Sequence, residues 1–289
     1  MTGRPSRQHR IGQAYPSGFE EDDRLRSNFI RDLSLQQFSR GDTTTGDRRA
    51  DLTATIPKTL VRFWHNSSQV PPDVRKCLDS WDALRAEGFE LLTFDDVSAS
   101  RYISDRYGPR EVTAFKRCRH PAMRSDYLRL CAVLADGGLY VDADDVLLGR
   151  GWQHIFRDST LKLQALCYNL GAGGMAPADD LLRVDLPYDD RIFYVNNNPI
   201  AAPSGHPVLA RALARATTRL LGSNPTPEIQ ETTGPGNITA ALALHARELQ
   251  VSGLAPDFEL LFEWDRTAEP CWDLAYRRDA RNWRNMGDR

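Results

Sequence analysis

The chain has 289 residues, of which 41% are hydrophobic and 26% charged, and its formal net charge at pH 7 is −2. These are ordinary values for a globular protein of one large domain, so they exclude wholesale disorder and a fibrous protein. The near balance of acidic and basic residues lacks the basic excess that is typical of nucleic-acid-binding proteins, and we predict no nucleic-acid partner.

Cysteine content and hydropathy limit the cellular setting. The five cysteines are widely spaced and form no Cys-x-x-Cys pair, which argues against a zinc ribbon or a disulfide scaffold and favours free thiols. No apolar stretch approaches the ~20 residues that a membrane-spanning helix needs. The arginine-containing N-terminus is not followed by the apolar segment of a secretory signal. We therefore expect no membrane span and a cytoplasmic location.

The first 55 residues differ in composition from the rest. They are rich in Arg, Asp, Ser, Thr and Gly, and their one apolar cluster, between Phe29 and Phe38, has the spacing of a short amphipathic helix that packs on the main body. The stretch from Gly41 to Arg49 has the composition of a flexible linker. We predict a partly flexible extension over residues 1–55 and a single domain over residues 56–289.

From residue 56 onwards, strand and helix patterns alternate. Pro121 is well placed to open a helix, and Gly137-Gly138 to end it at Asp136. The predicted strands are Leu60–Trp64, Phe89–Phe94, Leu139–Val141, Lys162–Cys167 and Ile192–Val195. The predicted helices are 74–84, 97–119 with a break at Gly108-Pro109, Pro121–Asp136, Pro207–Leu221 and Gly236–Gln250. This alternation predicts an α/β domain with a mostly parallel central sheet, in which ligands bind beyond the carboxyl ends of the strands.

The strand pattern after the glycine pair carries the strongest chemical signal. Tyr140, Asp142 and Asp144 alternate with small apolar residues, and a period of two places the aromatic ring and both carboxylates on one side of a strand. Two carboxylates this close repel each other unless a cation lies beside them. Their oxygens suit Mg²⁺ or Mn²⁺, which commonly bind substrate phosphates as well.

The preceding helix adds two residues to this group. Asp126 and Arg129 are three positions apart and therefore share one helix face. The short glycine turn is expected to bring that face close to the end of the strand. An acid, an arginine, a tyrosine and two carboxylates of the metal-binding type are thus predicted to converge.

This combination resembles the D-x-D sugar-binding glycosyltransferases, namely glycosyltransferase family 32 and its relatives, which include the catalytic domains of the large clostridial glucosylating toxins. The resemblance covers about residues 56–250. Its specific block runs from Arg124-Ser-Asp-Tyr-Leu-Arg129 to Gly137-Gly-Leu-Tyr-Val-Asp-Ala-Asp144, with weaker similarity around Trp64, at Asn197–Ser204 and at Thr233-Gly-Pro235.

The resemblance implies a GT-A-type fold that binds a nucleotide-sugar, and it implies roles for individual residues. Asp126 and Arg129 would hold the hydroxyl groups of the sugar, and Tyr140 would line the donor site. Asp142 would meet the donor and the metal shell, and Asp144 would ligate the metal, although Asp145 is an open alternative.

Outside this block, the resemblance makes Trp64 a base-stacking residue, and Asn197 would line the donor pocket. Relatives often place a Ser-Trp pair near the C-terminal end as a metal ligand and an aromatic contact. The nearest match here is Asn282-Trp283, so Asn282 is a predicted metal ligand and Trp283 a predicted donor contact.

The implied activity is the transfer of a hexose-type sugar, with retention of configuration, from a UDP- or GDP-sugar to an acceptor hydroxyl. The implied cofactor is Mn²⁺, with Mg²⁺ as an alternative. The acceptor is left open between a glycan, a lipid-linked glycan and a protein. Asp126, Arg129 and Asp142 are the predicted catalytic residues.

Two other functions stay open at this point. Val141-Asp-Ala-Asp-Asp-Val146 also fits the D-x-D-x-[TV] signature of haloacid-dehalogenase-like phosphatases, in which the first Asp, here Asp142, is the nucleophile. These enzymes need a downstream lysine, and only Lys162 follows the motif. The third candidate is a sugar-nucleotide-binding module without catalytic turnover.

Overall fold

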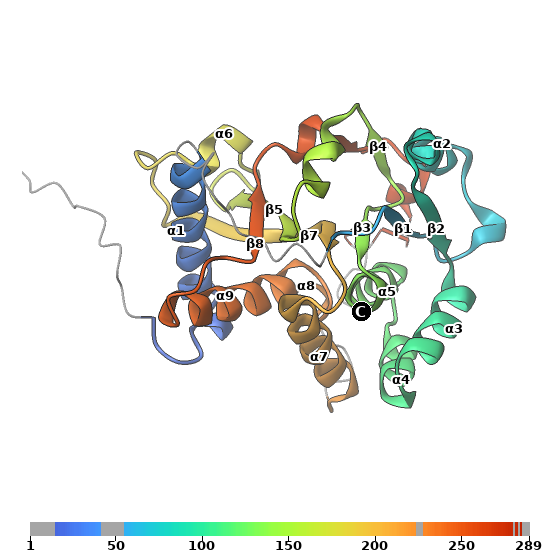
Figure 1. The fold of residues 1–289 in the computed structure, drawn as a ribbon, viewed down its shortest axis with the longest axis horizontal. Helices are drawn as coiled ribbons and strands as arrows, with labels where there is room; N and C mark the ends of the chain where they lie inside the picture. The colour runs from blue at the N-terminus through green and yellow to red at the C-terminus, as the bar shows by residue number, and fades with distance from the viewer. Residues whose placement is uncertain (1–14, 42–54, 224–227, 280, 283, 285–289) are drawn as a thin grey trace, which may run out of the picture.

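The computed structural model describes residues 15–41, 55–223, 228–279, 281, 282 and 284, and the statements below concern these residues (Figure 1). Its centre is a seven-stranded sheet with the order β2-β1-β3-β7-β5-β6, in which β8 also pairs with β5. A second, two-stranded ribbon pairs β4 (Asp145–Leu147) with β9 (Ala268–Pro270).

The strands of the central sheet run mostly in one direction. The strands are β1 (Thr59–Phe63), β2 (Glu90–Phe94), β3 (Gly138–Tyr140), β5 (Leu161–Asn169), β6 (Gly174–Met175), β7 (Arg191–Ala202) and β8 (Phe258–Leu261). Parallel pairing joins β1 to β2, β1 to β3 and β5 to β8, whereas β7 is antiparallel to both β3 and β5, and β6 is antiparallel to β5. Only β7 and β6 therefore oppose the other five strands. The prediction of an α/β domain with a mostly parallel sheet is confirmed.

Helices lie on both sides of this sheet, and the ribbon strand β4 lies on the same side as the helix over Pro72–Ser80 (Figure 1). The α-helices are α1 (Asp23–Gly41), α2 (Pro72–Ser80), α3 (Asp96–Arg106), α4 (Pro109–Arg117), α5 (Pro121–Asp136), α6 (Ala178–Leu181), α7 (Pro207–Leu221), α8 (Ile229–Thr232) and α9 (Pro235–Val251). Alternate residues of β1 and β3 enter two separate cores. Val61 and Tyr140 pack with α5, α7 and α9, while Leu60 and Leu139 pack with a cluster that includes Trp81.

The glycine pair after α5 allows β3 to form where it does. The His120 ring accepts a hydrogen bond from the Ala122 N–H at the start of α5, and Gly137 and Gly138 at its end have φ angles of 71° and 115°. A Cβ atom on Gly138 would lie 2.6 Å from the Thr59 carbonyl oxygen. Only glycine tolerates both this φ and this approach, so the pair sets β3 beside β1. The predicted helix end at Asp136 is confirmed.

The alternation of the D-x-D strand ends earlier than predicted. β3 stops at Tyr140, and the Asp145 N–H donates to the Asp142 carbonyl oxygen in a turn that leads into β4. Asp142 and Asp144 therefore lie on a turn and not on one face of a strand, and that prediction was wrong.

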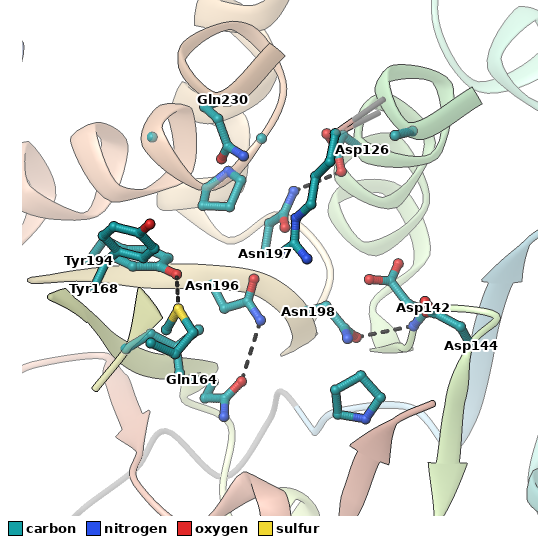
Figure 2. A pocket seen from close by; sticks show the side chains of 18 of the residues that line it. Asp126, Asp142, Asp144, Gln164, Tyr168, Tyr194, Asn196, Asn197, Asn198 and Gln230 are labelled. Carbon is teal, nitrogen blue, oxygen red and sulfur yellow. Dashed lines mark hydrogen bonds between the residues drawn. The ribbon is translucent and has the colours of Figure 1, made fainter. Parts of the chain in front are cut away.

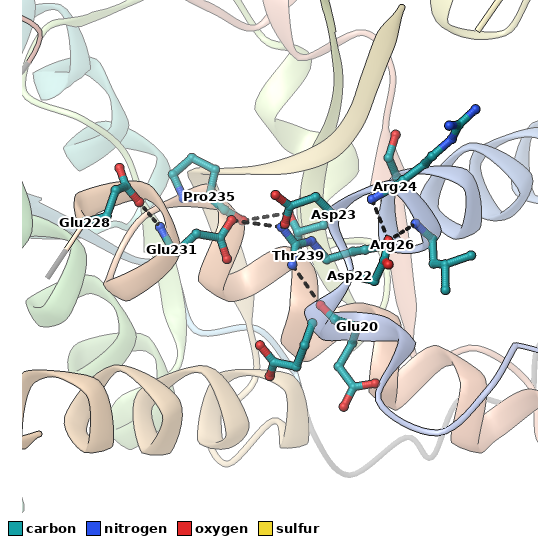
Figure 3. Close-up of polar contacts among 12 residues, drawn as sticks. Glu20, Asp22, Asp23, Arg24, Arg26, Glu228, Glu231, Pro235 and Thr239 are labelled. Atoms are coloured by element: carbon teal, nitrogen blue, oxygen red, sulfur yellow. Dashed lines mark hydrogen bonds and ion pairs between the residues drawn. The ribbon is translucent and has the colours of Figure 1, made fainter. Parts of the chain in front are cut away.

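The described part of the predicted extension contains the expected helix, longer than its apolar cluster suggested. Phe29, Ile30 and Leu33 of α1 are buried in the main core, against β7 and α9. The buried Arg26 side chain donates to Asp23 Oδ1 at 2.7 Å, to Glu231 Oε1 at 2.8 Å and to the Glu20 carbonyl oxygen at 2.8 Å (Figure 3). Except for Gly41, the predicted linker lies outside the described residues. The domain boundary at residue 56 stays a prediction.

Candidate active site

A cleft of 1340 Å³ runs across the carboxyl ends of β1 and β3 and along one face of β5 and β7. Its lining includes Trp64, Asp142 and Asp144, together with Asp126 and Arg129 of α5. The three consecutive asparagines in the middle of β7, residues 196–198, also line it. Figure 2 shows Asn197 beside Asp126 and Asn198 beside Asp142, with Asn196 next to Gln164. This is the position that ligands take in α/β sheets.

Arg129 links helix α5 to the turn that carries the D-x-D motif. Its Nη2 atom lies 3.0 Å from Asp126 Oδ1 and 2.8 Å from Asp142 Oδ1, and its guanidinium carbon lies 4.2 Å from the centre of the Tyr140 ring. Its Nη1 atom donates to the Asn197 carbonyl oxygen at 2.6 Å. Because the planar guanidinium has several donors in fixed directions, it orients both carboxylates at once. The residues predicted to converge do lie together.

The Asp142 carboxylate is held from two sides and is still open to the cleft. The Tyr140 hydroxyl, which is also 2.6 Å from Ser125 Oγ, donates to Asp142 Oδ1 at 3.0 Å. The side chain of Asp142 keeps 32% of its accessible surface. An oriented and accessible carboxylate is suited to contact a ligand directly.

The next two acids are both buried and both line the cleft, but they have different partners. Asp144 lines the cleft, where its Oδ2 atom accepts a hydrogen bond from the Tyr276 hydroxyl at 2.6 Å and forms an ion pair with Arg277. Asp145 is 1% exposed and accepts a hydrogen bond from Asn198 Nδ2 at 2.8 Å, and its Oδ1 atom is buried without a hydrogen-bond partner among the described residues. Asp144 is therefore the more accessible of the two.

The asparagines and a threonine complete the support of the acids. Asn197 Nδ2 donates to Asp126 Oδ1 at 2.8 Å, and Thr233 Oγ1 donates to Asp126 Oδ2 at 3.2 Å. Asn198 Oδ1 accepts the Asp142 backbone N–H at 3.1 Å while its amide nitrogen contacts Asp145. Both oxygens of Asp126 are thus engaged, and Asn198 fixes the backbone of the D-x-D turn.

Burial changes the proton affinities of these acids. Desolvation raises the pKa of Asp126 to about 6, although the Arg129 charge opposes this effect. Desolvation and the neighbouring Asp142 charge raise the pKa of Asp144, and desolvation raises the pKa of Asp145 well above its ordinary value. The site therefore concentrates carboxylic acids that a cation would help to keep ionised.

Three predicted residues from other parts of the chain have different surroundings. Trp64 lines the cleft and is also packed, with its ring centre 5.3 Å from that of Tyr276. Asn282 lines the cleft, but its amide donates to the Arg277 carbonyl oxygen at 2.8 Å and its Oδ1 accepts the Arg284 N–H at 3.2 Å. Asn282 is thus engaged within its own segment. Trp283 lies outside the described residues.

The carboxylates of the cleft offer part of a binding site for a divalent cation. Among the described residues, no three His, Cys, Asp or Glu side chains are grouped as a complete metal site. Asp142 and Asp144 nevertheless offer hard oxygen ligands at one end of the cleft, beside the orphaned Oδ1 of Asp145. Mg²⁺-type sites are usually built from one or two carboxylates plus substrate phosphates, so the residues fit a cation that binds together with a phosphorylated ligand.

Sequence reasoning missed two residues that contact these acids. Tyr276 and Arg277 lie 132 and 133 positions from Asp144, and no local pattern marks them. Asn198 belongs to the run of asparagines that could line the donor pocket, and Thr233 to a segment that could contact donor or acceptor, but their contacts with Asp145 and Asp126 were not predicted. The similarity at Thr233-Gly-Pro235 was the one signal that pointed to Thr233.

A comparison with known protein families matches the part of the chain that carries these acids. Residues 71–161, which include Asp126, Arg129, Asp142 and Asp144, match the family model "Glycosyltransferase sugar-binding region containing DXD motif". This stretch is similar to the D-x-D sugar-binding regions of glycosyltransferases. The predicted resemblance is thereby confirmed, and it supports glycosyl transfer as the general activity.

The structural comparison gives a more distant similarity. The chain is similar to a solved structure titled "PaToxG Glycosyltransferase", with 16% sequence identity and a TM-score of 0.48, over 86% of this chain and 99% of the other. A search among curated proteins found no match. In the described part of the chain, each helix is too short or too polar to span a bilayer.

Proposed function

We propose that the protein is a metal-dependent, retaining glycosyltransferase of GT-A type that moves a hexose from a nucleoside diphosphate sugar to an acceptor hydroxyl. The observation that carries this proposal is the contact of one buried arginine, Arg129, with both Asp126 and Asp142 inside a sugar-binding region of the D-x-D type. Mn²⁺, or Mg²⁺ in its place, is the proposed cofactor.

The donor would lie along the acid-rich end of the cleft. Asp126 and Arg129 would bind sugar hydroxyls, Tyr140 would support Asp142, and Trp64 would contact the base, with Asn197 holding Asp126 in place. Asp142 and Asp144 would hold the cation, which would neutralise the charge that grows on the departing diphosphate. Asn282 and Trp283 stay proposed contacts from the C-terminal segment.

Retention is the finer part of the proposal. Asp126 and Asp142 both pair with Arg129, and the two oxygens of Asp126 have further partners, so neither acid is presented as a free nucleophile. We therefore favour attack of the acceptor on the same face of the sugar from which the diphosphate leaves, without a covalent enzyme intermediate.

The acceptor would bind in the part of the cleft that runs along β5 and β7. There, Tyr168 and Tyr194 lie on the same face of β5 and β7 as the hydrogen-bonded pair Gln164–Asn196 (Figure 2). Amides and tyrosines on one surface suit hydroxyl-bearing ligands, since they offer hydrogen bonds beside flat apolar rings. A glycan, a lipid-linked glycan and a protein all stay candidates for the acceptor.

The surroundings of Lys162, the lysine that a phosphatase of this class would need, argue against the phosphatase alternative. Lys162 is fully buried, and its Nζ atom lies 2.7 Å from Asp158 Oδ1 and 2.5 Å from Glu259 Oε2, so two other acids neutralise it. It does not line the cleft. Asp142 pairs with Arg129 instead. A binding module without turnover stays the alternative that an assay has to exclude. The cytoplasmic location of the protein also stays a proposal.

The direct test is release of nucleoside diphosphate from a panel of UDP- and GDP-sugars with Mn²⁺, with water as the default acceptor. We expect slow hydrolysis of one donor, lost on chelation and in the Asp142→Asn variant. Binding of a donor without any hydrolysis or transfer would favour the non-catalytic module. Metal-dependent hydrolysis of p-nitrophenyl phosphate without donor hydrolysis would favour the phosphatase.

A further inference from the structure

Arg277 occupies the side of Asp144 that faces the C-terminal segment. Its Nη2 atom is paired with Asp144 Oδ2, and the side chains of the two residues keep only 15% and 12% of their accessible surface. The Tyr276 hydroxyl donates to the same oxygen. The proposed function assigns the Asp144 carboxylate to a cation. In the free protein, one oxygen of this carboxylate is already paired with a positively charged side chain of the protein itself.

The Arg277 side chain is also held near the cleft by neutral groups. Its Nε atom donates to the Cys271 carbonyl oxygen at 3.1 Å, and its guanidinium carbon lies 4.3 Å from the centre of the Trp272 ring. The Trp272 side chain lines the cleft and is 57% exposed. These contacts do not involve Asp144, so they can keep the guanidinium beside the cleft when its partner changes.

A divalent cation and Arg277 compete for Asp144. If a cation binds there, the arginine loses this ion pair while it is still largely buried, and breaking a buried ion pair is strongly unfavourable. Asp142, Asp144 and the diphosphate of a nucleotide-sugar together bring more negative charge than one divalent cation neutralises. The planar fork of an arginine matches phosphate oxygens in two parallel hydrogen bonds.

From this juxtaposition we infer that Arg277 has two alternating partners: it neutralises Asp144 in the free protein and binds the donor diphosphate once a cation takes Asp144. The inference rests on the proposed function and adds a diphosphate-binding residue to it. Its consequence is that the metal alone binds weakly, whereas the metal and the nucleotide bind well together. The free protein is thereby protected against filling its site with a cation before the donor arrives.

The experiment compares wild type with Arg277→Gln in two titrations of the full chain, both followed by calorimetry. Mn²⁺ alone is expected to bind the variant about tenfold more tightly, because the competing charge is gone. UDP and GDP are titrated separately at saturating Mn²⁺, and the nucleotide that binds wild type is expected to bind the variant about tenfold more weakly. A merely structural role of Arg277 would not move the two affinities in opposite directions.

Arg278→Gln is the matched control. The neighbouring Arg278 side chain is 78% exposed and pairs with Asp273, so this variant is expected to keep both affinities. Thermal melting establishes that the variants fold. If Arg277→Gln does not fold, Arg277→Lys keeps the charge and gives up the fork. It is expected to retain weak Mn²⁺ binding and to lose nucleotide affinity.

The outcomes separate this inference from the proposed function. Equal Mn²⁺ affinity in wild type and Arg277→Gln, or a nucleotide affinity that does not change, would overturn the alternation of partners. The same holds if Arg277→Lys keeps the full nucleotide affinity. If neither wild type nor Arg277→Gln binds Mn²⁺ with or without nucleotide, the metal-dependent function itself fails, and the inference fails with it.

Discussion

Arg129 on α5 lies 2.8 Å from the Asp142 carboxylate on the turn after β3, and the same nitrogen lies 3.0 Å from Asp126. This contact joins a helix to the turn that follows the next strand. The guanidinium is almost fully buried, with 4% of its side chain accessible. The position of the D-x-D turn therefore depends on one residue that also faces the cleft.

Replacement of Arg129 by Gln is expected to damage both stability and ligand binding. Removing one partner from a buried ion pair leaves the other charge uncompensated, at a cost of about 3–5 kcal/mol. Urea unfolding should show this loss, and donor binding should fall below detection. Arg266→Gln is the control, since that side chain is 77% exposed. A variant as stable as wild type would show that the two carboxylates do not depend on Arg129.

Asp144 and Asp145 are expected to respond differently to the same substitution. Asp144→Asn should abolish metal-dependent turnover, because the residue would lose its charged oxygen at the open end of the cleft. Asp145 is buried, and its raised pKa favours the neutral carboxylic acid, which an amide imitates. Asp145→Asn should therefore cost about 1 kcal/mol or less of stability and keep metal binding. The reverse result, with turnover lost only in Asp145→Asn, would assign the metal to Asp145.

Asp126 should make stability depend on pH in a defined direction. Its pKa is about 6 in the folded protein and near the ordinary 3.8 in the unfolded chain, so the folded state binds the extra proton between these values. The stability that Asp126 contributes is therefore highest at about pH 4, falls as the pH rises, and levels off above about pH 6. The total change is about 3 kcal/mol at most.

The check is the free energy of unfolding, by urea, of wild type minus that of Asp126→Asn between pH 4 and pH 7. The difference should fall with rising pH and then become flat. Asp273→Asn serves as the control because its side chain is 87% exposed, and its difference should stay constant. A difference for Asp126 that rises with pH would show that the ion pair with Arg129 outweighs burial.

Helix α1 should be required for folding. Phe29 is 2% exposed in the main core, and its replacement by Ala is expected to cost about 3–5 kcal/mol. Phe38 lies on the same helix but is 49% exposed, so Phe38→Ala should cost about 1 kcal/mol. Deletion of residues 1–41 should prevent cooperative unfolding in a thermal melt. A truncated chain that still melts cooperatively would support a separable extension over residues 1–55.

The sequence predicted the elements whose patterns are local. The Pro121–Asp136 helix and the strand that follows it were placed because a proline, a glycine pair and apolar periodicity all lie within 25 residues. By contrast, β4, β6, β8 and β9 have two to four residues each, too few for a period to be visible. β4, β8 and β9 form by pairing with distant segments, and β6 by pairing with the end of β5, and only the folded chain provides these pairings.

In the candidate site too, the sequence predicted the contacts that depend on local spacing but not the contacts between distant segments. Asp126 and Arg129 could be placed together because helical spacing is fixed, and the glycine turn brought them towards Asp142. The contacts of Asn198 with the D-x-D turn and of Arg277 with Asp144 could not be predicted, since nothing in the local sequence records a neighbour that distant. The turn at Asp142 was also missed, because an alternating sequence fits both a strand and the start of a turn.

The most direct test of the central claim is calorimetric titration of UDP- and GDP-sugars into wild type with Mn²⁺ and after chelation, with Asp144→Asn as the site variant and Asp145→Asn as its matched control. Our account predicts that one donor binds wild type and Asp145→Asn only when Mn²⁺ is present, and that Asp144→Asn does not bind it. Donor binding of equal strength with and without the metal, or unchanged in Asp144→Asn, would contradict it.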